Sequence, residues 1–258
     1  MDALNRIGFD KRPVQLLLQS DEEKGSSPSG KATINYICEK AKDAIAFLNL
    51  EPHIAHTSTM IRKGILRYEF NITGKAVHSS LCYDGASAIT EAAHKILKLE
   101  EMKDKDGITC NCGLIRGGSA GNSVPAECSI VADLRYPEPK DYDIIDRRMK
   151  EIAEENTIEG CTCEVKQISS RPAMHKAEKN FALLNKANKI FKENGLPELT
   201  VRINNGGSDA AYVTLNNIPC MDSLGVEGLE EHSEFERAKL DSLKNSAKRI
   251  AALTYCIE

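Results

Sequence analysis

The chain has 258 residues, with 34 Lys and Arg, 38 Asp and Glu, and a net charge of -4. This balance gives no basic surface for nucleic acid, so a small molecule or a peptide is the expected substrate. No uncharged apolar run approaches the roughly 18 residues of a membrane span, and the opening MDALNRIGFDK does not resemble a signal peptide. We therefore expect a cytoplasmic protein that contacts neither membrane nor nucleic acid.

The cysteines do not indicate a secreted, disulfide-linked scaffold. There are nine of them, an odd number, and no C-x-x-C motif occurs. The pairs Cys110/Cys112 and Cys161/Cys163 lie in strand-like stretches, where residues i and i+2 share a face. We interpret them as buried reduced thiols, with a metal or redox role as the less favoured alternative.

The first part of the chain has the pattern of an α/β unit. A helix end (ALNRI) is followed by an apolar strand at Val14–Leu18, the acidic turn QSDEEKGS, a helix over residues 31–42 and an apolar strand over 44–50. Short apolar runs separated by helices predict a mainly parallel, buried sheet.

The middle of the chain has a different pattern of predicted strands and helices. Gly64–Thr73 alternates like a half-solvated strand, and helical spacing follows over 85–99. The next expected elements are strands over 108–115 and 127–135, a helix over 142–155, and a strand over 161–168. The order β-α-β-β-α-β predicts a ferredoxin-like unit. Such a unit has an exposed sheet edge, which favours pairing with a second copy.

The last part of the chain again has the pattern of an α/β unit. The expected elements are a helix over 181–194, the turn NNGGSDAAY, a strand over 218–224 and a helix over 241–256. The predicted organisation is one α/β domain, residues 1–62 and 174–258, interrupted by a lid over residues 63–173.

The acidic turn Gln19–Ser26 places three carboxylates in a row. A solvated turn is one interpretation, because Asp, Lys, Gly and Ser are ordinary loop residues. In an extended chain, however, Glu22 and Glu23 would point to opposite sides. One could then hold a cation while the other handles the proton of a water on that cation.

Four other stretches could contribute to such a site. Glu51 follows a predicted strand, and His232 lies in a polar loop where an imidazole could bind zinc. The glycine turn at 205–210 could bind an anion or simply cap a helix, and Gly74–Ser80 ends a strand. Each stretch alone also has an ordinary structural explanation.

Seven motifs, taken in order, resemble one family. They are DEEKGS, LEP, GKAVHSS, GGSAGNSVPAECSIVADLRYPEP, RPAM, GGSDAAY and SLGVEGLEEHSE. Together they resemble the zinc-dependent exopeptidases and amidohydrolases that include glutamate carboxypeptidase, peptidase T and aminoacylase, over essentially the whole chain. The resemblance implies a partial zinc-exopeptidase-like catalytic domain interrupted by an inserted ferredoxin-like dimerisation lid.

The resemblance also implies roles for residues of the catalytic domain. Glu22 would be the general base, which takes a proton from water and passes it to the leaving amine. Glu23 and His232 would bind one zinc ion, and Glu51 would bind the second.

Further roles are implied for the lid and the glycine turn. His78 would reach across a dimer to stabilise the oxyanion, and Asn122 would bind substrate. Arg171, together with the backbone of Gly207 and Ser208, would hold a free carboxylate, for which a guanidinium fork is well suited.

The implied activity is metal-dependent hydrolysis of the amide bond of a peptide or N-acyl amino acid by a homodimer with two zinc ions per complete site. The alternative is a non-catalytic dimeric protein, derived from such an enzyme, that binds a carboxylate ligand or a partner. The amino acid and acyl group, the metal used in the cell and the roles of His53, His56 and His175 are not indicated by the sequence.

Two motifs of the family are not found in this sequence: a His-x-Asp and an aspartate in a D-x-K-G-G context. The opening MDALNRIGF resembles the helix after D-x-K-G-G, so we expect the N-terminal part of the catalytic domain to be missing, by truncation or by natural loss. Glu23, His232 and Glu51 are too few for two catalytic zinc ions with three protein ligands each. We therefore expect weak metal binding and negligible turnover from this chain alone.

Overall fold

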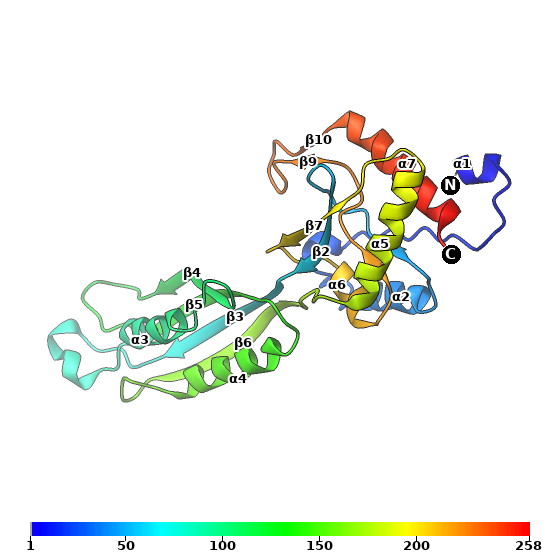
Figure 1. The fold of residues 1–258 in the computed structure, drawn as a ribbon. Coiled ribbons are helices and arrows are strands. Elements are labelled where there is room, and N and C mark those ends of the chain that lie inside the picture. The colour runs from blue at the N-terminus through cyan, green and yellow to red at the C-terminus, as the bar shows by residue number, and fades with distance from the viewer. Residues whose placement is uncertain (1) are drawn as a thin grey trace. The chain divides into compact units, whose positions relative to one another are not determined.

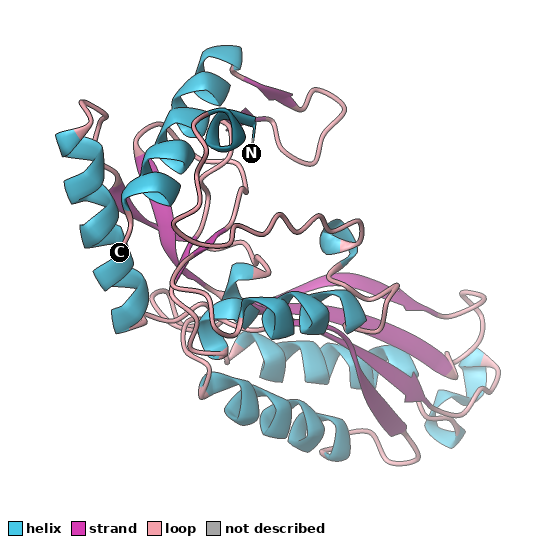
Figure 2. Ribbon diagram, turned by 90° about the vertical axis from the view of Figure 1, so that its right-hand side faces the viewer, coloured by secondary structure: helices cyan, strands magenta, loops and turns pink. Residues whose placement is uncertain are grey.

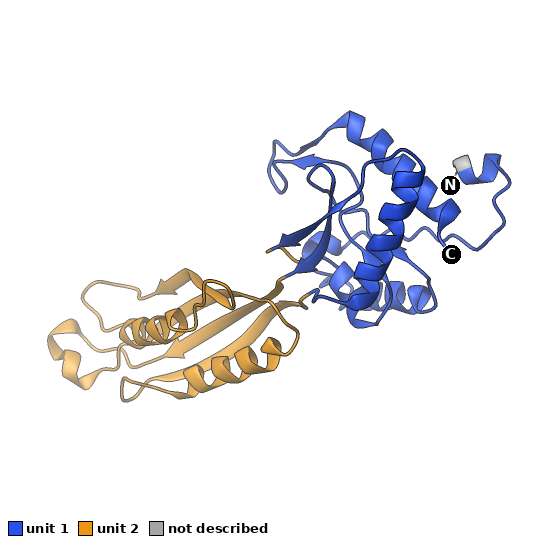
Figure 3. Ribbon diagram, viewed as in Figure 1, with its two compact units in different colours: residues 1–62, 174–204, 208–258 blue, residues 63–173, 205–207 orange. Residues whose placement is uncertain are grey.

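The computed structural model describes residues 2–258, which form two compact units (Figure 3). Unit 1 comprises the chain up to Arg62 together with Met174–Asn204 and Ser208–Glu258. Unit 2 comprises Lys63–Ala173 and Asn205–Gly207. In the described part of the chain, no helix is long and apolar enough to cross a bilayer.

Unit 2 has the predicted ferredoxin-like order of elements (Figure 1). They are β3 (Gly64–Thr73), η2 (Ser79–Asp84), α3 (Ala88–Glu100), β4 (Thr109–Gly117), β5 (Glu127–Tyr136), α4 (Asp141–Glu154) and β6 (Thr162–Arg171). The strands form one antiparallel sheet in the order β4-β5-β3-β6. The fold class predicted for this part of the chain is confirmed.

The core of unit 2 follows from alternation along its strands. Every second residue of β3 is buried, namely Leu66, Tyr68, Phe70 and Ile72. These side chains pack in one cluster with buried residues of α3 and α4. Because successive side chains of a strand point to opposite faces, the residues between them lie on the other face of the sheet.

A buried ion pair joins the two helices of unit 2. Lys95 Nζ lies 3.1 Å from Glu91 Oε1, and neither side chain is exposed. Lys95 also donates to the carbonyl of Ile152 near the end of α4, at 2.8 Å. Glu91 Oε2 accepts from the backbone N–H groups of Thr157 and Ile158. The pair therefore satisfies backbone groups at and beyond the carboxyl end of α4, which would otherwise be buried without partners.

Removal of one member of this pair should destabilise unit 2. Lys95→Ala would leave the Glu91 carboxylate buried without a counter-charge, so we expect the free energy of unfolding to fall by about 3–5 kcal/mol in urea denaturation. Lys98→Ala is the matched control, because Lys98 lies on the same helix, pairs with Glu155 and is 27% exposed. The control should lose about 1 kcal/mol or less. Equal losses in the two variants would contradict the role of the buried pair.

Unit 1 contains helices and short strands. Figure 2 shows the helices and strands of the whole chain in different colours. The elements are α1 (Asp2–Arg6), η1 (Glu22–Lys24), α2 (Ala32–Ala41), β1 (Phe47–Leu48), β2 (Thr57–Arg62), α5 (Glu178–Glu193), β7 (Thr200–Asn204), α6 (Ala210–Leu215), β8 (Cys220–Met221), β9 (Gly228–Leu229), β10 (Arg237–Ala238) and α7 (Leu240–Cys256). Strands β1 and β8 pair in parallel, as do β2 and β7, whereas β9 and β10 are antiparallel.

Strand β8 separates two apolar clusters of unit 1. Met221 packs with buried residues of α5 and α7, whereas its neighbour Cys220 packs with those of α2 and α6. This arrangement follows from the alternation of side chains along a strand, and it explains why both residues are fully buried.

The prediction of a strand at Val14–Leu18 is wrong. This run has no strand conformation, and no described strand pairs with it. Leu16 is 62% exposed and Leu18 is 87% exposed. An apolar run becomes a strand only where a neighbouring strand accepts its backbone hydrogen bonds, and none does so here.

Candidate active site

The acidic turn is folded rather than extended. Glu22–Lys24 form the short 3-10 helix η1, which ends at Gly25 in the left-handed conformation with φ of 62°. The expectation that Glu22 and Glu23 point to opposite sides of an extended chain is therefore wrong. Residues of a 3-10 helix are instead rotated by about 120° from one to the next.

Asp21 anchors the start of this turn. A hydrogen bond from Ser29 is the main cause that lowers the pKa of Asp21 below its usual value. The carboxylate also accepts from Thr33 Oγ1 and Gln19 Nε2, each at 3.2 Å. Gln19 Nε2 donates in addition to Asp209 Oδ2 at 2.8 Å. The two glutamates are thus presented by a turn that is bonded both to the start of α2 and to the motif GGSDAAY.

Glu51 lies among other carboxylates in unit 1. Burial is the main cause that raises its pKa to about 7, and the negative charges of Glu22, Asp222 and Glu23 raise it further. Arg62 acts in the opposite direction. Because electrostatic effects of this kind weaken with distance, the fold has placed acidic groups that are distant in sequence in the same region of unit 1. A cation at this position would relieve their repulsion.

His232 joins the same group. Its Nδ1 atom lies 3.5 Å from Glu23 Oε2, although the two residues are more than two hundred positions apart. The loop between β9 and β10 carries His232 at a φ of 64°, and Glu236 Oε2 accepts from its backbone N–H. The structure therefore brings together Glu22, Glu23, Glu51 and His232.

These residues suit a divalent cation in charge and in donor type. Zinc binds carboxylate oxygen and imidazole nitrogen, and the crowding of negative charge around Glu51 favours a cation. Among residues 2–258, however, no three His, Cys, Asp or Glu side chains converge closely enough to hold a metal ion. The converging ligands are fewer than the three that a catalytic zinc usually takes from the protein.

Two charged residues beside Glu51 were missed by the sequence analysis. Arg62 Nε lies 2.6 Å from Asp222 Oδ2, and both side chains are buried. Each residue follows an apolar run at the carboxyl end of a strand, β2 or β8. Since α/β sheets build their sites at this end of the strands, polar residues there were a usable signal.

His78 and Asn122 lie together in unit 2. The backbone N–H of Ser79 donates to the Asn122 carbonyl at 2.9 Å, and His78 forms an isolated bridge with Ser123. His78 also caps η2, since its Nδ1 accepts the N–H of Ser80. A neutral imidazole that accepts at Nδ1 carries its proton on Nε2. The exposed His78 ring thus has a donor available for an oxyanion.

Arg171 lies against the glycine turn. A Cβ atom added to Gly207 would lie 2.9 Å from Arg171 Cδ, so glycine allows this close approach. Ser208, the next residue, is buried and belongs to unit 1. Its Oγ accepts from Asn49 Nδ2 at 3.1 Å and from the N–H of Ala210 at 3.2 Å. The Ser208 side chain is therefore occupied by structural hydrogen bonds.

Arg171 and His78 lie toward opposite ends of the sheet in unit 2. Arg171 is opposite Ile65 near the start of β3, whereas His78 follows Thr73 at the end of the same strand. The eight steps from Ile65 to Thr73 span about 26 Å at about 3.3 Å per residue. One small substrate cannot contact both side chains of the same unit 2.

His53 and His56, whose roles the sequence left open, make structural contacts. His53 is 4% exposed, and its backbone N–H donates to the carbonyl of Val226. His56 Nδ1 lies 3.1 Å from Arg249 Nη2. Because an arginine can only donate, His56 Nδ1 is the acceptor of this hydrogen bond.

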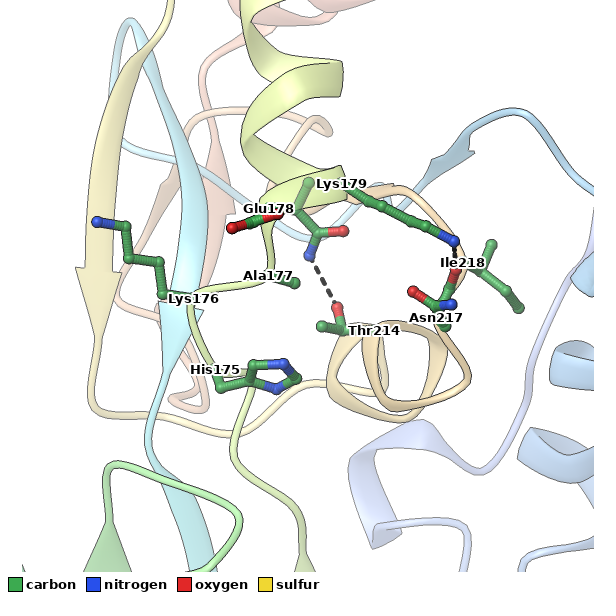
Figure 4. A pocket seen from close by; sticks show the side chains of 9 residues that line it. His175, Lys176, Ala177, Glu178, Lys179, Thr214, Asn217 and Ile218 are labelled. Atoms are coloured by element: carbon green, nitrogen blue, oxygen red, sulfur yellow. Dashed lines mark hydrogen bonds between the residues drawn. The ribbon is translucent and has the colours of Figure 1, made fainter.

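His175 lines a separate pocket of about 360 Å³ at the start of α5 (Figure 4). Here Asn180 Nδ2 donates to Thr214 Oγ1 at 3.0 Å, and Lys179 Nζ donates to the carbonyl of Asn217 at 3.2 Å. None of Glu22, Glu23, Glu51 and His232 lines this pocket. It therefore adds nothing to the candidate site.

Residues 61–161 match the family described as peptidase dimerisation domain. Carboxypeptidase G2 from Pseudomonas sp. (strain RS-16) is 31% identical over 229 residues, which are 87% of this chain and 54% of that protein. Acetylornithine deacetylase from Myxococcus xanthus is 29% identical over 141 residues, 48% of this chain and 35% of that protein. The chain spans about half the length, or less, of these relatives.

Solved structures of peptidases share the fold. An aminopeptidase PepT from Bacillus cereus has a TM-score of 0.72 at 23% identity. The match covers 88% of this chain and 61% of the PepT chain. A tripeptidase from Staphylococcus aureus has a TM-score of 0.70 at 25% identity. The match covers 88% of this chain and 60% of the tripeptidase chain. A dinuclear metal-binding peptidase of the M20 family from Bacillus subtilis has a TM-score of 0.61 at 17% identity, with 82% and 57% covered. The predicted fold is confirmed: an α/β domain similar to that of the peptidases, interrupted by an inserted ferredoxin-like lid.

Stability should depend on pH through Glu51. Its pKa rises from an ordinary 4.5 to about 7 on folding, so between these values the folded protein binds more protons than the unfolded chain. Stability therefore falls as the pH rises through this window. In metal-free buffer, Glu51→Gln should remove the loss and exceed the wild type at pH 8 by up to about 3 kcal/mol in urea denaturation.

Glu39→Gln is the control for this experiment. Glu39 is exposed, and its hydrogen bond with Lys42 lowers its pKa, so its contribution changes only below the window of Glu51. The control should keep the wild-type slope between pH 5 and pH 7. A Glu51→Gln variant with that same slope would refute the assignment.

Proposed function

We propose that this chain is part of a metal-dependent hydrolase. Its match to the peptidase dimerisation domain and its similarity to carboxypeptidase G2 and to solved peptidases support the proposal. The substrate class is a peptide or an N-acyl amino acid with a free carboxylate, and the bond cleaved is its amide. The observation that carries the proposal is the convergence in unit 1 of Glu22, Glu23, Glu51 and His232.

In this proposal Glu23 and His232 hold one zinc ion, and Glu51 holds a second. When bound, zinc supplies a Lewis acid and lowers the pKa of a water molecule. Glu22 acts as the general base: a carboxylate oxygen accepts the proton of the attacking water and then delivers it to the leaving amine. The raised pKa of Glu51 supports cation binding here, because a cation would favour the ionised carboxylate.

The residues of unit 2 orient the substrate and stabilise charge. Arg171, with the backbone of Gly207 and Ser208, holds the free carboxylate. His78 donates from Nε2 to the carbonyl oxygen as negative charge develops there, and Asn122, beside it, binds the substrate. Arg171 lies opposite Ile65 near the start of β3, and His78 follows the end of that strand, about 26 Å along it from Ile65. In this proposal a second copy therefore supplies one of the two residues.

We infer that the two copies meet at strand β4. This strand is at one edge of the sheet, so one side of its backbone has no partner among the described strands. Leu114 and Ile115 on β4 are 52% and 53% exposed. An apolar, unpaired edge strand favours pairing with another strand, and the match to a peptidase dimerisation domain supports a homodimer.

The metal site can be tested directly on this chain. With Glu23 and His232 for one ion and Glu51 for the other, we expect at most one weakly bound zinc per chain and negligible hydrolysis of N-acyl amino acids and dipeptides. Metal analysis after gel filtration and a substrate panel measure both quantities. Two tightly bound ions or robust turnover would overturn the expectation of an incomplete site. Carboxylate binding without turnover, even after metal is added, would favour a non-catalytic binding protein.

The dimer has a matched pair of variants. Ile115→Lys on β4 should convert a dimer to a monomer, because it places a charge at the proposed interface. Ile168→Lys is the control, since Ile168 is 46% exposed on β6, the opposite edge strand of the same sheet. Sedimentation velocity distinguishes the species. A wild-type protein that stays monomeric at all concentrations would refute the dimer, and dissociation by Ile168→Lys alone would place the interface at β6.

A further inference from the structure

Unit 2 contains a cavity that the roles above leave unused. Its volume is about 520 Å³, and it is lined by the end of β3, the end of β4, the start of β5 and the loop after β4. Ser123, which pairs with His78, is one of the lining residues. The cavity therefore borders the segment that carries His78 and Asn122. Its volume lies in the range of small-molecule sites.

Arg116 is the only cationic residue among those that line the cavity. The register places it opposite Ser129 of β5, which is opposite Asn71 of β3, so these three side chains lie on the sheet face that the helices leave bare. Within residues 2–258, no ion pair or hydrogen bond is formed by the Arg116 guanidinium. By contrast, Arg67 on the same face lies 2.7 Å from Asp133.

The rest of the lining can accommodate an anion. Gly117 and Gly118 bring backbone close to the cavity without side chains, and Gly118 has a φ of 75°, which glycine adopts without strain. Asn71, Ser119 and Ser129 add uncharged polar groups. Apart from Glu127, the lining around Arg116 is uncharged. An exposed arginine with no partner among the described residues is suited to bind a carboxylate through two parallel hydrogen bonds.

We propose that Arg116 and this cavity bind a second carboxylate of the substrate, separate from the free carboxylate assigned to Arg171 of the other copy. Two copies are needed because Arg116 lies level with Asn71, about 20 Å along β3 from Ile65, the residue opposite Arg171 in the same unit 2. The inference rests on the proposed function for the substrate class, which it narrows to dicarboxylates. It does not depend on turnover. The second carboxylate belongs either to the acyl group or to the side chain of the amino acid, and both have the chemistry that Arg116 recognises.

Removal of the Glu127 charge should change the ligand affinity in the opposite direction to removal of Arg116. Glu127 is the only carboxylate among the residues that line the cavity, and it lies two positions before Ser129 on the same face of β5. Its negative charge opposes an acidic ligand near Arg116. Removal of this charge should therefore strengthen binding of the ligand, whereas removal of Arg116 should weaken it.

The experiment is titration calorimetry on the full chain at low ionic strength. The ligands are N-acetyl-L-alanine, N-succinyl-L-alanine and N-acetyl-L-aspartate, which differ in the number and place of carboxylates. We expect one of the two dicarboxylates to bind about tenfold more tightly than N-acetyl-L-alanine, as for one charge-assisted hydrogen-bonded pair. Preference for the succinyl compound assigns the second carboxylate to the acyl group, and preference for the aspartate assigns it to the amino acid.

Three variants decide the outcome. Arg116→Ala should abolish the preference for the dicarboxylate and leave the affinity for N-acetyl-L-alanine unchanged. Glu127→Gln should increase the preference for the dicarboxylate, and Arg67→Ala should retain it. No preference in the wild type, no measurable binding of either dicarboxylate, or an unchanged preference in Arg116→Ala would each overturn the proposal. If the preference for the dicarboxylate is intact but the protein remains inactive with added metal, the proposed hydrolase function fails and the proposed binding by Arg116 stands.

Discussion

Unit 1 depends on the buried ion pair between Arg62 and Asp222. Asp222 Oδ1 also accepts from Asn49 Nδ2 at 2.9 Å, and Asn49 donates in turn to Ser208 Oγ. The ends of β1, β2 and β8 and the glycine turn therefore meet around one carboxylate. A buried pair adds little net stability, but the loss of either partner leaves a buried charge. The same carboxylate raises the pKa of Glu51, so the fold and the candidate site share one charged group.

The sequence predicts the two units unequally well, for a physical reason. Each strand of unit 2 has one face in the core, so alternation in a stretch such as Gly64–Thr73 reports the strand directly. In β2, by contrast, Ser58, Thr59 and Met60 are all buried, and consecutive burial gives no period of two. Strands β1 and β8 have two residues each, too few for any pattern. Val14–Leu18 has the composition of a strand without the neighbour that would make it one.

The candidate site was found by resemblance rather than by local geometry. The reasoning that an extended turn separates Glu22 from Glu23 was wrong, because these residues form a 3-10 helix. The approach of His232 to Glu23 depends on tertiary contacts between distant segments, which no local pattern contains. Arg116 could not have been singled out at all. Its interest comes from the register of three strands and from the lack of an internal partner among the described residues.

The partly exposed run Val14–Leu18 also bears on the solubility of the protein. It is uncharged and mostly apolar, and no described strand pairs with it. Strand β7 adds Val201 and Ile203, which are 46% and 65% exposed. Such segments are templates for strand pairing between molecules. The run is bounded by Arg12 and Pro13 on one side and by the acidic turn on the other, residue types that restrain aggregation when they flank an apolar strand. The carboxylates of the acidic turn thus also limit aggregation, and their neutralisation would reduce solubility together with cation binding.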